Sequence, residues 1–368
     1  MPEPAAVPSG FAAGVTAALA ETPDADPRRL WQALGRHGVL TALFTAGDRF
    51  PRADRVGELL AALDARLPVG TVLSVCVQVA TALPILREHS ADRPDLRTVT
   101  EAALAGRSML ALAATDAHGA GSDLMSLATT ATLTGDRVVL SGGKQWITNA
   151  CTADHALVLA RHSPRPHFTS FLWVLVPMDR PGVRATPAPT GLFDGAGVGS
   201  IDLDEVSLDR AMLVGSPGRG LPTFLRHVTT ERLAGGLWAA AICRRVLAGT
   251  REALAGRPLA GGSVWDAPAV QHRFARCLQL KWQIEAACTQ LLAAPPSTAM
   301  VQGMLLKATV AQNLDAVLGE CGQLLGSRAF ETGGVAQLRA ETAMFGIAGG
   351  ASGAMLAGIA DHAADLLA

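Results

Sequence analysis

Tyrosine is absent from this chain of 368 residues, and all aromatic residues together make up only 4%. The hydrophobic cores must therefore be packed mainly with alanine, leucine and valine. The formal net charge is -1 and no region is strongly basic, which argues against nucleic acid as a partner. The six cysteines form no C-x-x-C pair, which predicts reduced, mostly buried thiols. Cys151 and His155 have a ligand-like gap but no second pair, so no metal site is expected.

Signals for export and for membrane insertion are also missing from the pattern of residues. The first ten residues, MPEPAAVPSG, lack a basic segment followed by an apolar one. We find no stretch of eighteen uncharged apolar residues and expect no membrane span. These observations predict a cytoplasmic protein. With 49% hydrophobic residues, a chain of this length is expected to form two or three domains.

Three zones differ in composition and in hydrophobic period. Residues 1–107 show helical spacing in RRLWQALGRHGVLTALF and VGELLAALDARL, with breaks at Pro68 and Pro94. Residues 108–208 contain short apolar runs bounded by Gly, Pro or Asp, and SLATTATL and RVVLSG flank a hairpin turn at Gly135. Residues 209–368 contain four long segments with helical spacing, typical of an antiparallel bundle. We predict an α+β protein with an N-terminal helical domain, a central β-barrel or sandwich, and a C-terminal four-helix bundle.

Two short segments of the central zone carry the polar groups of greatest interest. The segment ATDAHGAGSDLMS, residues 114–126, has glycines that allow a ligand close to the backbone. About twenty-five residues later, GKQWITNA places an indole, a hydroxyl and an amide within four positions. The second segment could be an ordinary sheet edge. Together, the two segments indicate a site for a flat polar ring.

The segment TDAHGAGSDLMSLATTATLTGDRVVLSGGKQWITN resembles the middle domain of the acyl-CoA dehydrogenase family, whose pattern is T-E-P-x-A-G-S-D followed by N-G-x-K-x-W-I-T-N. The resemblance extends to WQALGRHGVL, VSLDRAMLVGSPGRGL and GRPLAGGSVWDAPAVQHRFA, and thus covers nearly the whole chain. It implies a flavoprotein oxidoreductase with FAD as cofactor. It also implies a substrate that is an acyl thioester, on CoA or on an acyl carrier protein, and an electron acceptor such as an electron-transfer flavoprotein or O2.

The resemblance assigns cofactor contacts to residues of both segments. Trp146 would lie beside the isoalloxazine ring, and the Thr148 hydroxyl would reach flavin N5, the atom that accepts hydride. Thr115 would be the corresponding hydroxyl of the first segment, with Gly121 allowing the backbone close to the cofactor, and Ser122 would approach the pyrophosphate. His118 lies in a one-residue insertion relative to the family pattern. It is either a loop residue or a polar group near the substrate.

Removal of the α-proton of a thioester needs a carboxylate base. In one branch of the family this glutamate lies near the C-terminus, where GIAGGASGAM here places Gly349. A second branch carries it in an L-E-R segment on an earlier helix, where VTTERLAGG offers Glu231 followed by Arg232. We predict Glu231 as the base, with Arg232, Gly349 and His118 near the substrate. A helix start at Thr229 or Thr230 would instead make Glu231 a capping residue.

Two further residues match cofactor contacts made between subunits of the family. Arg257 lies fourteen positions before Gln271, as in the family's R-x-x-F-G…Q pattern, and would reach the FAD pyrophosphate of a neighbouring subunit. Gln323 matches the glutamine that meets the adenosine end of FAD. A homodimer or homotetramer would then be required.

Three functions are compatible with these residues. The first is FAD-dependent α,β-dehydrogenation of an acyl thioester, in specialised metabolism by weak compositional association. The second is a flavin monooxygenase of the same fold that uses reduced flavin and O2. The third is a catalytically silent homologue that binds an acyl carrier, which the intact GKQWITN segment disfavours.

Overall fold

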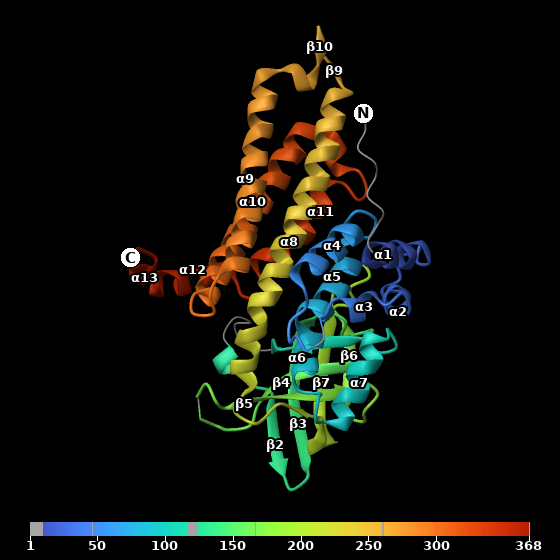
Figure 1. Cartoon of the computed structure of the whole chain (residues 1–368), viewed down its shortest axis with the longest axis vertical. Coiled ribbons are helices and arrows are strands. Elements are labelled where there is room, and N and C mark those ends of the chain that lie inside the picture. Colours follow the sequence, from blue (N-terminus) through green and yellow to red (C-terminus); the bar gives the residue numbers. More distant parts are fainter. Residues whose placement is uncertain (1–9, 46, 117–123, 166, 260, 368) are drawn as a thin grey trace. The chain divides into compact units, whose positions relative to one another are not determined.

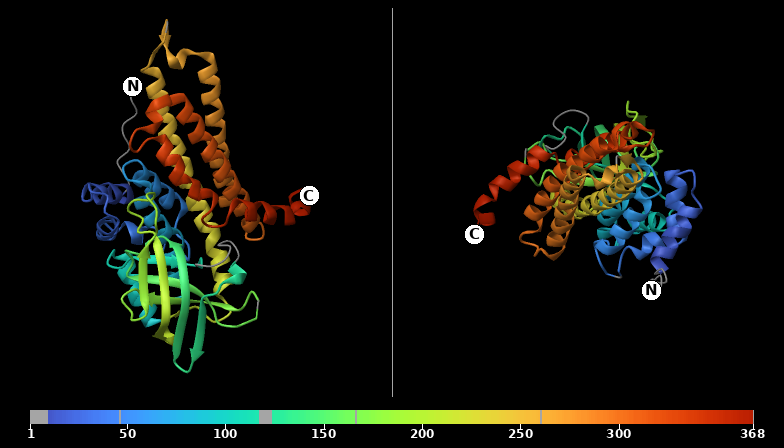
Figure 2. Two further views of the ribbon diagram at one scale, coloured as in Figure 1. Left: turned by 180° about the vertical axis from the view of Figure 1, so that it is seen from behind. Right: turned by 90° about the horizontal axis from the view of Figure 1, so that it is seen from above.

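The computed structural model describes residues 10–45, 47–116, 124–165, 167–259 and 261–367. The chain separates into two compact units, Met1–Thr230 and Glu231–Ala368, and each is described by itself. Figure 1 labels the elements of both units, and Figure 2 gives two further views.

Helices form the first part of the first unit, as the sequence predicts. In chain order they are α1 (Gly10–Ala20), α2 (Pro27–Arg36), α3 (Val39–Ala42), α4 (Ala53–Asp64), α5 (Val69–Val77), a π-helical turn (Gln78–Ala82), α6 (Leu83–Glu88) and α7 (Pro94–Leu104). Proline begins α2 and α7, where its fixed φ suits the first helical position. Leucine and valine dominate the buried positions of these helices.

The segment from Val69 to Glu88 departs from the expectation that no candidate membrane span is present. The most apolar 18-residue window of this 20-residue segment has a mean hydropathy of 2.0, and the segment could cross a membrane by length and composition alone. In the folded chain, 89% of the most apolar window is buried within the protein. The apolar character of the segment is thus used in packing, as in the core helix of a globular domain.

A mixed eight-stranded sheet forms the second part of this unit and is seen from behind in Figure 2, left. Seven strands follow the order β6-β7-β3-β2-β4-β5-β8, and β1 pairs with β4. The strands are β1 (Leu110–Ala113), β2 (Thr130–Thr134), β3 (Arg137–Ile147), β4 (His155–Arg161), β5 (Phe171–Pro177), β6 (Val183–Pro187), β7 (Gly199–Asp209) and β8 (Leu213–Val214). The turn at Gly135 joins β2 to β3 in an antiparallel hairpin, which confirms the hairpin prediction.

The second unit is helical. Beyond the part of α8 (Gly220–Ala255) that it contains, its elements are the short strands β9 (Pro258–Leu259) and β10 (Gly262–Ser263), then α9 (Pro268–Ala293), α10 (Ala299–Leu325), α11 (Val335–Thr342), α12 (Ser352–Asp361) and α13 (Ala363–Leu367). The long helices α9 and α10 pack side by side (Figure 1). Gly236 of α8 allows close packing, because an added Cβ would lie 2.7 Å from Cys288 Sγ and 3.1 Å from Leu306 Cδ1.

The start of α8 corrects one reading of the sequence. The helix begins at Gly220, so Glu231 lies three turns inside it and is not a residue of the first turn. A capping role for Glu231 is therefore wrong. The sequence concealed this because Thr229 and Thr230 have the composition of a helix start, while tertiary packing continues the helix through them.

Candidate functional site

A buried ion pair holds the two segments of the central zone together. Lys144 and Asp116 lie 2.5 Å apart, with side chains that are 0% and 4% exposed. Lys144 also donates to the carbonyl of Ala114, and Asp116 accepts from the backbone and hydroxyl of Thr129. Burial lowers the pKa of Lys144 to about 8, against the attraction of Asp116. Burial alone would raise the pKa of Asp116, but Lys144 and the hydrogen bonds outweigh it and leave that pKa lowered.

Strand β3 bulges immediately after this anchor. Lys144 is paired with Ile201 and Ile147 with Gly199, so three steps on β3 face two steps on β7. The extra residue falls at Trp146, which has a φ of 57°, an uncommon conformation for a residue with a side chain. Trp146 is 56% exposed, whereas Lys144 and Ile147 are buried. The bulge therefore turns a large indole out of the sheet.

A second anchor follows at Asn149, three residues after Trp146. Its side chain is fully buried and donates to the carbonyls of Ser74 and Leu110 at 3.1 Å, while it accepts from the Ser74 hydroxyl at 2.6 Å. Its φ of 65° is one that asparagine tolerates better than most residues. Thr148 lies half-buried between the buried Ile147 and Asn149. Trp146 and Thr148 therefore lie on a short segment that is fixed at both ends, by Lys144 and by Asn149.

Thr115 lies beside this presented segment. Its carbonyl accepts a hydrogen bond of 3.2 Å from the Gln145 backbone, and Asp116 forms an antiparallel bridge with Lys144. The structure therefore brings the first and second segments together at Thr115. His118, Gly121 and Ser122 lie outside the described residues.

The second unit holds the predicted base. Glu231 is half-buried on α8. An ideal Cβ placed on Gly349 would lie 2.8 Å from Glu231 Oε1 and 4.0 Å from the ammonium nitrogen of Lys307. Gly349 has a φ of +69°, which also favours glycine. The carboxylate of Glu231 thus occupies the space that a side chain at residue 349 would need.

Two buried cations, Arg232 and Lys307, lie near enough to this carboxylate for its charge to act on both. Arg232 is 8% exposed, its Nη2 lies 3.5 Å from the point where Gly350 would carry a Cβ, and its Nε has no hydrogen-bond partner among the described residues. Burial lowers the pKa of Arg232, and Glu231 partly offsets this. Lys307 of α10 is 7% exposed, and burial lowers its pKa to about 8, again partly offset by Glu231. The cluster combines one carboxylate with two cations.

Comparisons with known proteins identify the family. Residues 111–210 match the sequence profile of "Acyl-CoA dehydrogenase, middle domain", and residues 218–364 match that of "Acyl-CoA dehydrogenase, C-terminal domain". The chain belongs to the acyl-CoA dehydrogenase family. This family consists of flavin-dependent oxidoreductases that act on CH–CH bonds, and both the predicted family and the predicted enzyme class are confirmed.

A curated relative and two solved structures illustrate the match. An acyl-[acyl-carrier-protein] dehydrogenase of Mycobacterium sp. (strain MCS) is 27% identical over 86% of this chain and 80% of its own length. An acyl-CoA dehydrogenase of Geobacillus kaustophilus superposes with a TM-score of 0.85 at 18% identity, over 98% of this chain and 99% of that one. The prolyl acyl carrier protein oxidase AnaB also gives 0.85 at 18% identity, over 96% and 97%. The predicted fold class is confirmed.

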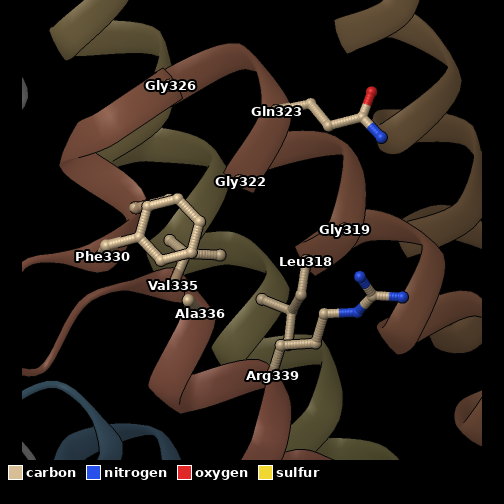
Figure 3. Close-up of a pocket in the computed structure, with 10 residues that line it drawn as sticks. Leu318, Gly319, Gly322, Gln323, Gly326, Phe330, Val335, Ala336 and Arg339 are labelled. Carbon is tan, nitrogen blue, oxygen red and sulfur yellow. The ribbon is translucent and has the colours of Figure 1, made fainter.

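A pocket lies between the end of α10 and α11 of this acyl-CoA dehydrogenase family member (Figure 3). It has a volume of about 430 Å³, and Gly319, Gly322 and Gly326 leave its floor without side chains. Gln323 lies on its rim and accepts a hydrogen bond of 2.8 Å from Arg273. Phe330, which is 81% exposed, lines the opposite side. Gln323 was predicted from the sequence, whereas the pocket beside it was not, because only the packing of α11 completes it.

Arg257 is exposed in the turn after α8. Its carbonyl accepts from the Val264 backbone at 2.8 Å, which closes the short β9–β10 hairpin. The guanidinium is not used in any ion pair given by the described residues.

Lys307 was not predicted as a residue of the site, and Asn149 was predicted as a possible wall of the ring site but not as a buried anchor. A lysine within the apolar run GMLLKATV was the available signal for Lys307, because a cation on a buried helical face requires a partner. The signal for Asn149 was weaker, since asparagine after a strand is usual in turns.

Proposed function

We propose that this protein is an FAD-dependent dehydrogenase that introduces an α,β double bond into an acyl thioester. Glu231 takes the α-proton, and Thr148 supplies the hydroxyl beside the hydride-accepting nitrogen. The main support for this proposal is the position of the Glu231 carboxylate, which fills the space that a side chain on Gly349 would need. FAD, when bound, supplies the acceptor for the β-hydrogen, which leaves as hydride.

The steric relation between Glu231 and Gly349 supports Glu231 as the base. In the family resemblance, these two positions are the alternative locations of the catalytic glutamate. Here an oxygen of Glu231 lies 2.8 Å from the missing Cβ of residue 349, so the carboxylate reaches the alternative position from α8. Glu231 would therefore act at the place where the other branch of the family has a glutamate at the position of Gly349.

The residues around the C-terminal end of β3 fit a flavin. Trp146 offers an exposed indole of the kind that a flat aromatic ring can cover, and Thr148 offers a hydroxyl two residues away. The anchors at Lys144 and Asn149 hold both residues without using the Thr148 hydroxyl in any hydrogen bond given by the described residues. Such fixed placement is what a site for hydride transfer requires, because reacting atoms must be held in one geometry.

The pocket at Gln323 supports a cofactor shared between subunits. Its apolar walls and the exposed Phe330 suit the adenine ring, and the Gln323 amide nitrogen remains able to donate while its oxygen accepts from Arg273. The C-terminal end of α10 disfavours phosphate, which suits the adenosine end of FAD better than its pyrophosphate. Arg257 is exposed and able to pair with the pyrophosphate of a partner subunit. The proposal therefore includes a homo-oligomer.

An acyl group on a carrier protein is the substrate that we favour. The relative of 27% identity is an acyl-carrier-protein dehydrogenase, and AnaB, of the same fold, is a carrier protein oxidase. The resemblance adds that Thr229 stands where an aspartate often holds the pantetheine arm of CoA. Electrons would pass to an electron-transfer flavoprotein or to O2.

The first test follows the flavin spectrum of the purified protein during anaerobic addition of acyl-CoA and acyl-carrier thioesters. We expect a carrier-bound thioester to bleach the flavin without NAD(P)H. Glu231→Gln should retain FAD and slow bleaching by roughly 10²–10⁴-fold, as is typical for loss of a general base. Glu252→Gln, a neutralised exposed glutamate on the same helix, is the matched control and should bleach at the native rate.

Three outcomes would contradict the proposal. Near-native bleaching by Glu231→Gln would remove Glu231 from the mechanism. A flavin that is reduced only by an added reductase would favour the monooxygenase. A protein that takes up no flavin on reconstitution would leave only a binding function.

A further inference from the structure

Lys307 is a buried cation in an otherwise apolar face of α10. Valine, methionine and leucine side chains at residues 301, 304, 306 and 310 are buried on the same helix. Lys307 itself is 7% exposed, and burial lowers its pKa to about 8. A lysine in this position needs a reason, because removing an ammonium group from water is costly.

Glu231 is the carboxylate whose negative charge favours the protonated form of Lys307. Glu231 Oε1 and Lys307 Nζ lie 2.8 Å and 4.0 Å from one point, the missing Cβ of Gly349. Attraction to Glu231 raises the pKa of Lys307, while repulsion from Arg232 lowers it. Other charged groups on neighbouring elements, Glu341 on α11 and the Asp315–Arg339 pair between α10 and α11, are not among the groups that shift this pKa.

The balance of costs separates a functional role from a structural one. A lysine whose pKa is lower in the folded state than in the unfolded state destabilises the fold at neutral pH. Methionine fills a similar volume without this cost, and hydrophobic replacements of buried ionic groups are often neutral or stabilising. Arg232 remains beside Glu231 in either case. Lys307 is thus a poor choice for stability alone.

We propose that Lys307 is a positioning residue for the catalytic carboxylate: its ammonium group keeps Glu231 ionised and oriented over Gly349. This inference rests on the proposed role of Glu231 as base. A nearby cation favours the charged form of a carboxylate, so the base stays ready to accept a proton at lower pH. Its attraction also holds the carboxylate in the space that Gly349 leaves open.

The test compares Lys307→Met with the native holoenzyme in single-turnover flavin bleaching between pH 5.5 and 9.5. Without the cation, Glu231 should become protonated at higher pH, and the acid limb of the rate should move up by about one pH unit, or tenfold in rate on that limb. Above about pH 8 native Lys307 is itself losing its proton, so the native and variant rates should converge. Lys307→Arg keeps the charge and should restore the native acid limb.

Thermal unfolding supplies a readout independent of activity. Because the native lysine carries a burial cost below pH 8, Lys307→Met at pH 7 should unfold at the same temperature as the native protein or higher. Lys281→Met is the matched control, since it removes a lysine that pairs with Glu285 at 2.7 Å on α9; it should leave the pH profile unchanged. Lys307→Gln repeats the comparison with a polar side chain if the methionine variant does not fold.

The outcomes separate this inference from the proposed function. An unshifted acid limb in the neutral variants, or a uniform loss of rate with a lower unfolding temperature, would reduce Lys307 to a structural residue. If Glu231→Gln is inactive while Lys307→Met keeps the native profile, only the inference about Lys307 fails. If Glu231→Gln bleaches at the native rate, Glu231 is not the base, and the inference about Lys307 fails with that assignment.

Discussion

Gly349 is informative because it has no side chain. In the sequence it is a glycine, at the position where the resemblance to the family places the base of one branch. In the structure the position is filled from elsewhere, by the Glu231 carboxylate, and a positive φ adds a second reason for glycine. Gly349 and Glu231 therefore share one space, and a larger side chain at residue 349 should displace the Glu231 carboxylate.

Gly349→Ala should impair the proposed base, Glu231, without replacing it. The new Cβ would lie 2.8 Å from Glu231 Oε1, closer than real Cβ contacts, and φ at +69° is strained for alanine. We expect at least a tenfold lower bleaching rate and a loss of stability of about 1 kcal/mol or more. Gly353→Ala on α12, where nothing lies within 4 Å of the new Cβ, should be neutral or stabilising. A native bleaching rate in Gly349→Ala would show that the carboxylate moves aside freely.

At the scale of elements, the bulge of β3 is held in place on both sides, by the Lys144–Asp116 pair before it and by Asn149 after it. The alternation of RVVLSG predicted the strand, and the turn at Gly135 predicted the hairpin. The bulge at Trp146 could not be predicted, because it depends on how β3 registers against β7, about sixty residues away. The buried pair of Lys144 with Asp116 likewise becomes visible only when the two segments pair.

Lys144→Met should release this anchor. Removing one partner of a buried ion pair leaves the Asp116 carboxylate uncompensated, at a cost of about 3–5 kcal/mol in the free energy of unfolding. We expect a lower denaturation midpoint and weaker FAD retention, measured by chemical unfolding and by flavin absorbance after gel filtration. Asp116→Asn combined with Lys144→Met should recover part of the loss. A double variant no more stable than the single one would argue against the pair as the anchor.

At the scale of the whole molecule, the proposed function includes a cofactor site to which more than one chain contributes. The first unit contains Trp146 and Thr148, and the second contains Glu231 and the pocket beside α10. Arg257 and Gln323 lie on exposed parts of the second unit, where a partner molecule can reach them. Assembly and FAD retention should therefore be coupled.

Gly322→Leu tests this coupling by filling the pocket. Only Ala329 and Val335 lie near an added Cβ, both at 3.9 Å, so the leucine side chain has room to extend into the pocket. We expect FAD to dissociate more readily and the proposed oligomer to loosen in analytical ultracentrifugation, with the secondary structure unchanged. Gly249→Leu, at an exposed position of α8 with open space around it, is the control. Unchanged FAD retention in Gly322→Leu would separate the pocket from the cofactor.

Short-range patterns in the sequence determined much of this protein. Hydrophobic period and turn residues located its helices and strands, and the paired segments around residues 115 and 146 were sufficient for the family and the enzyme class. Tertiary structure alone decided where α8 begins, how Trp146 leaves the sheet, and that Glu231, Lys307 and Gly349 meet. The reason is physical: period and turn chemistry act within a few residues, whereas a bulge, a buried ion pair and a shared space depend on residues brought together only when the chain has folded.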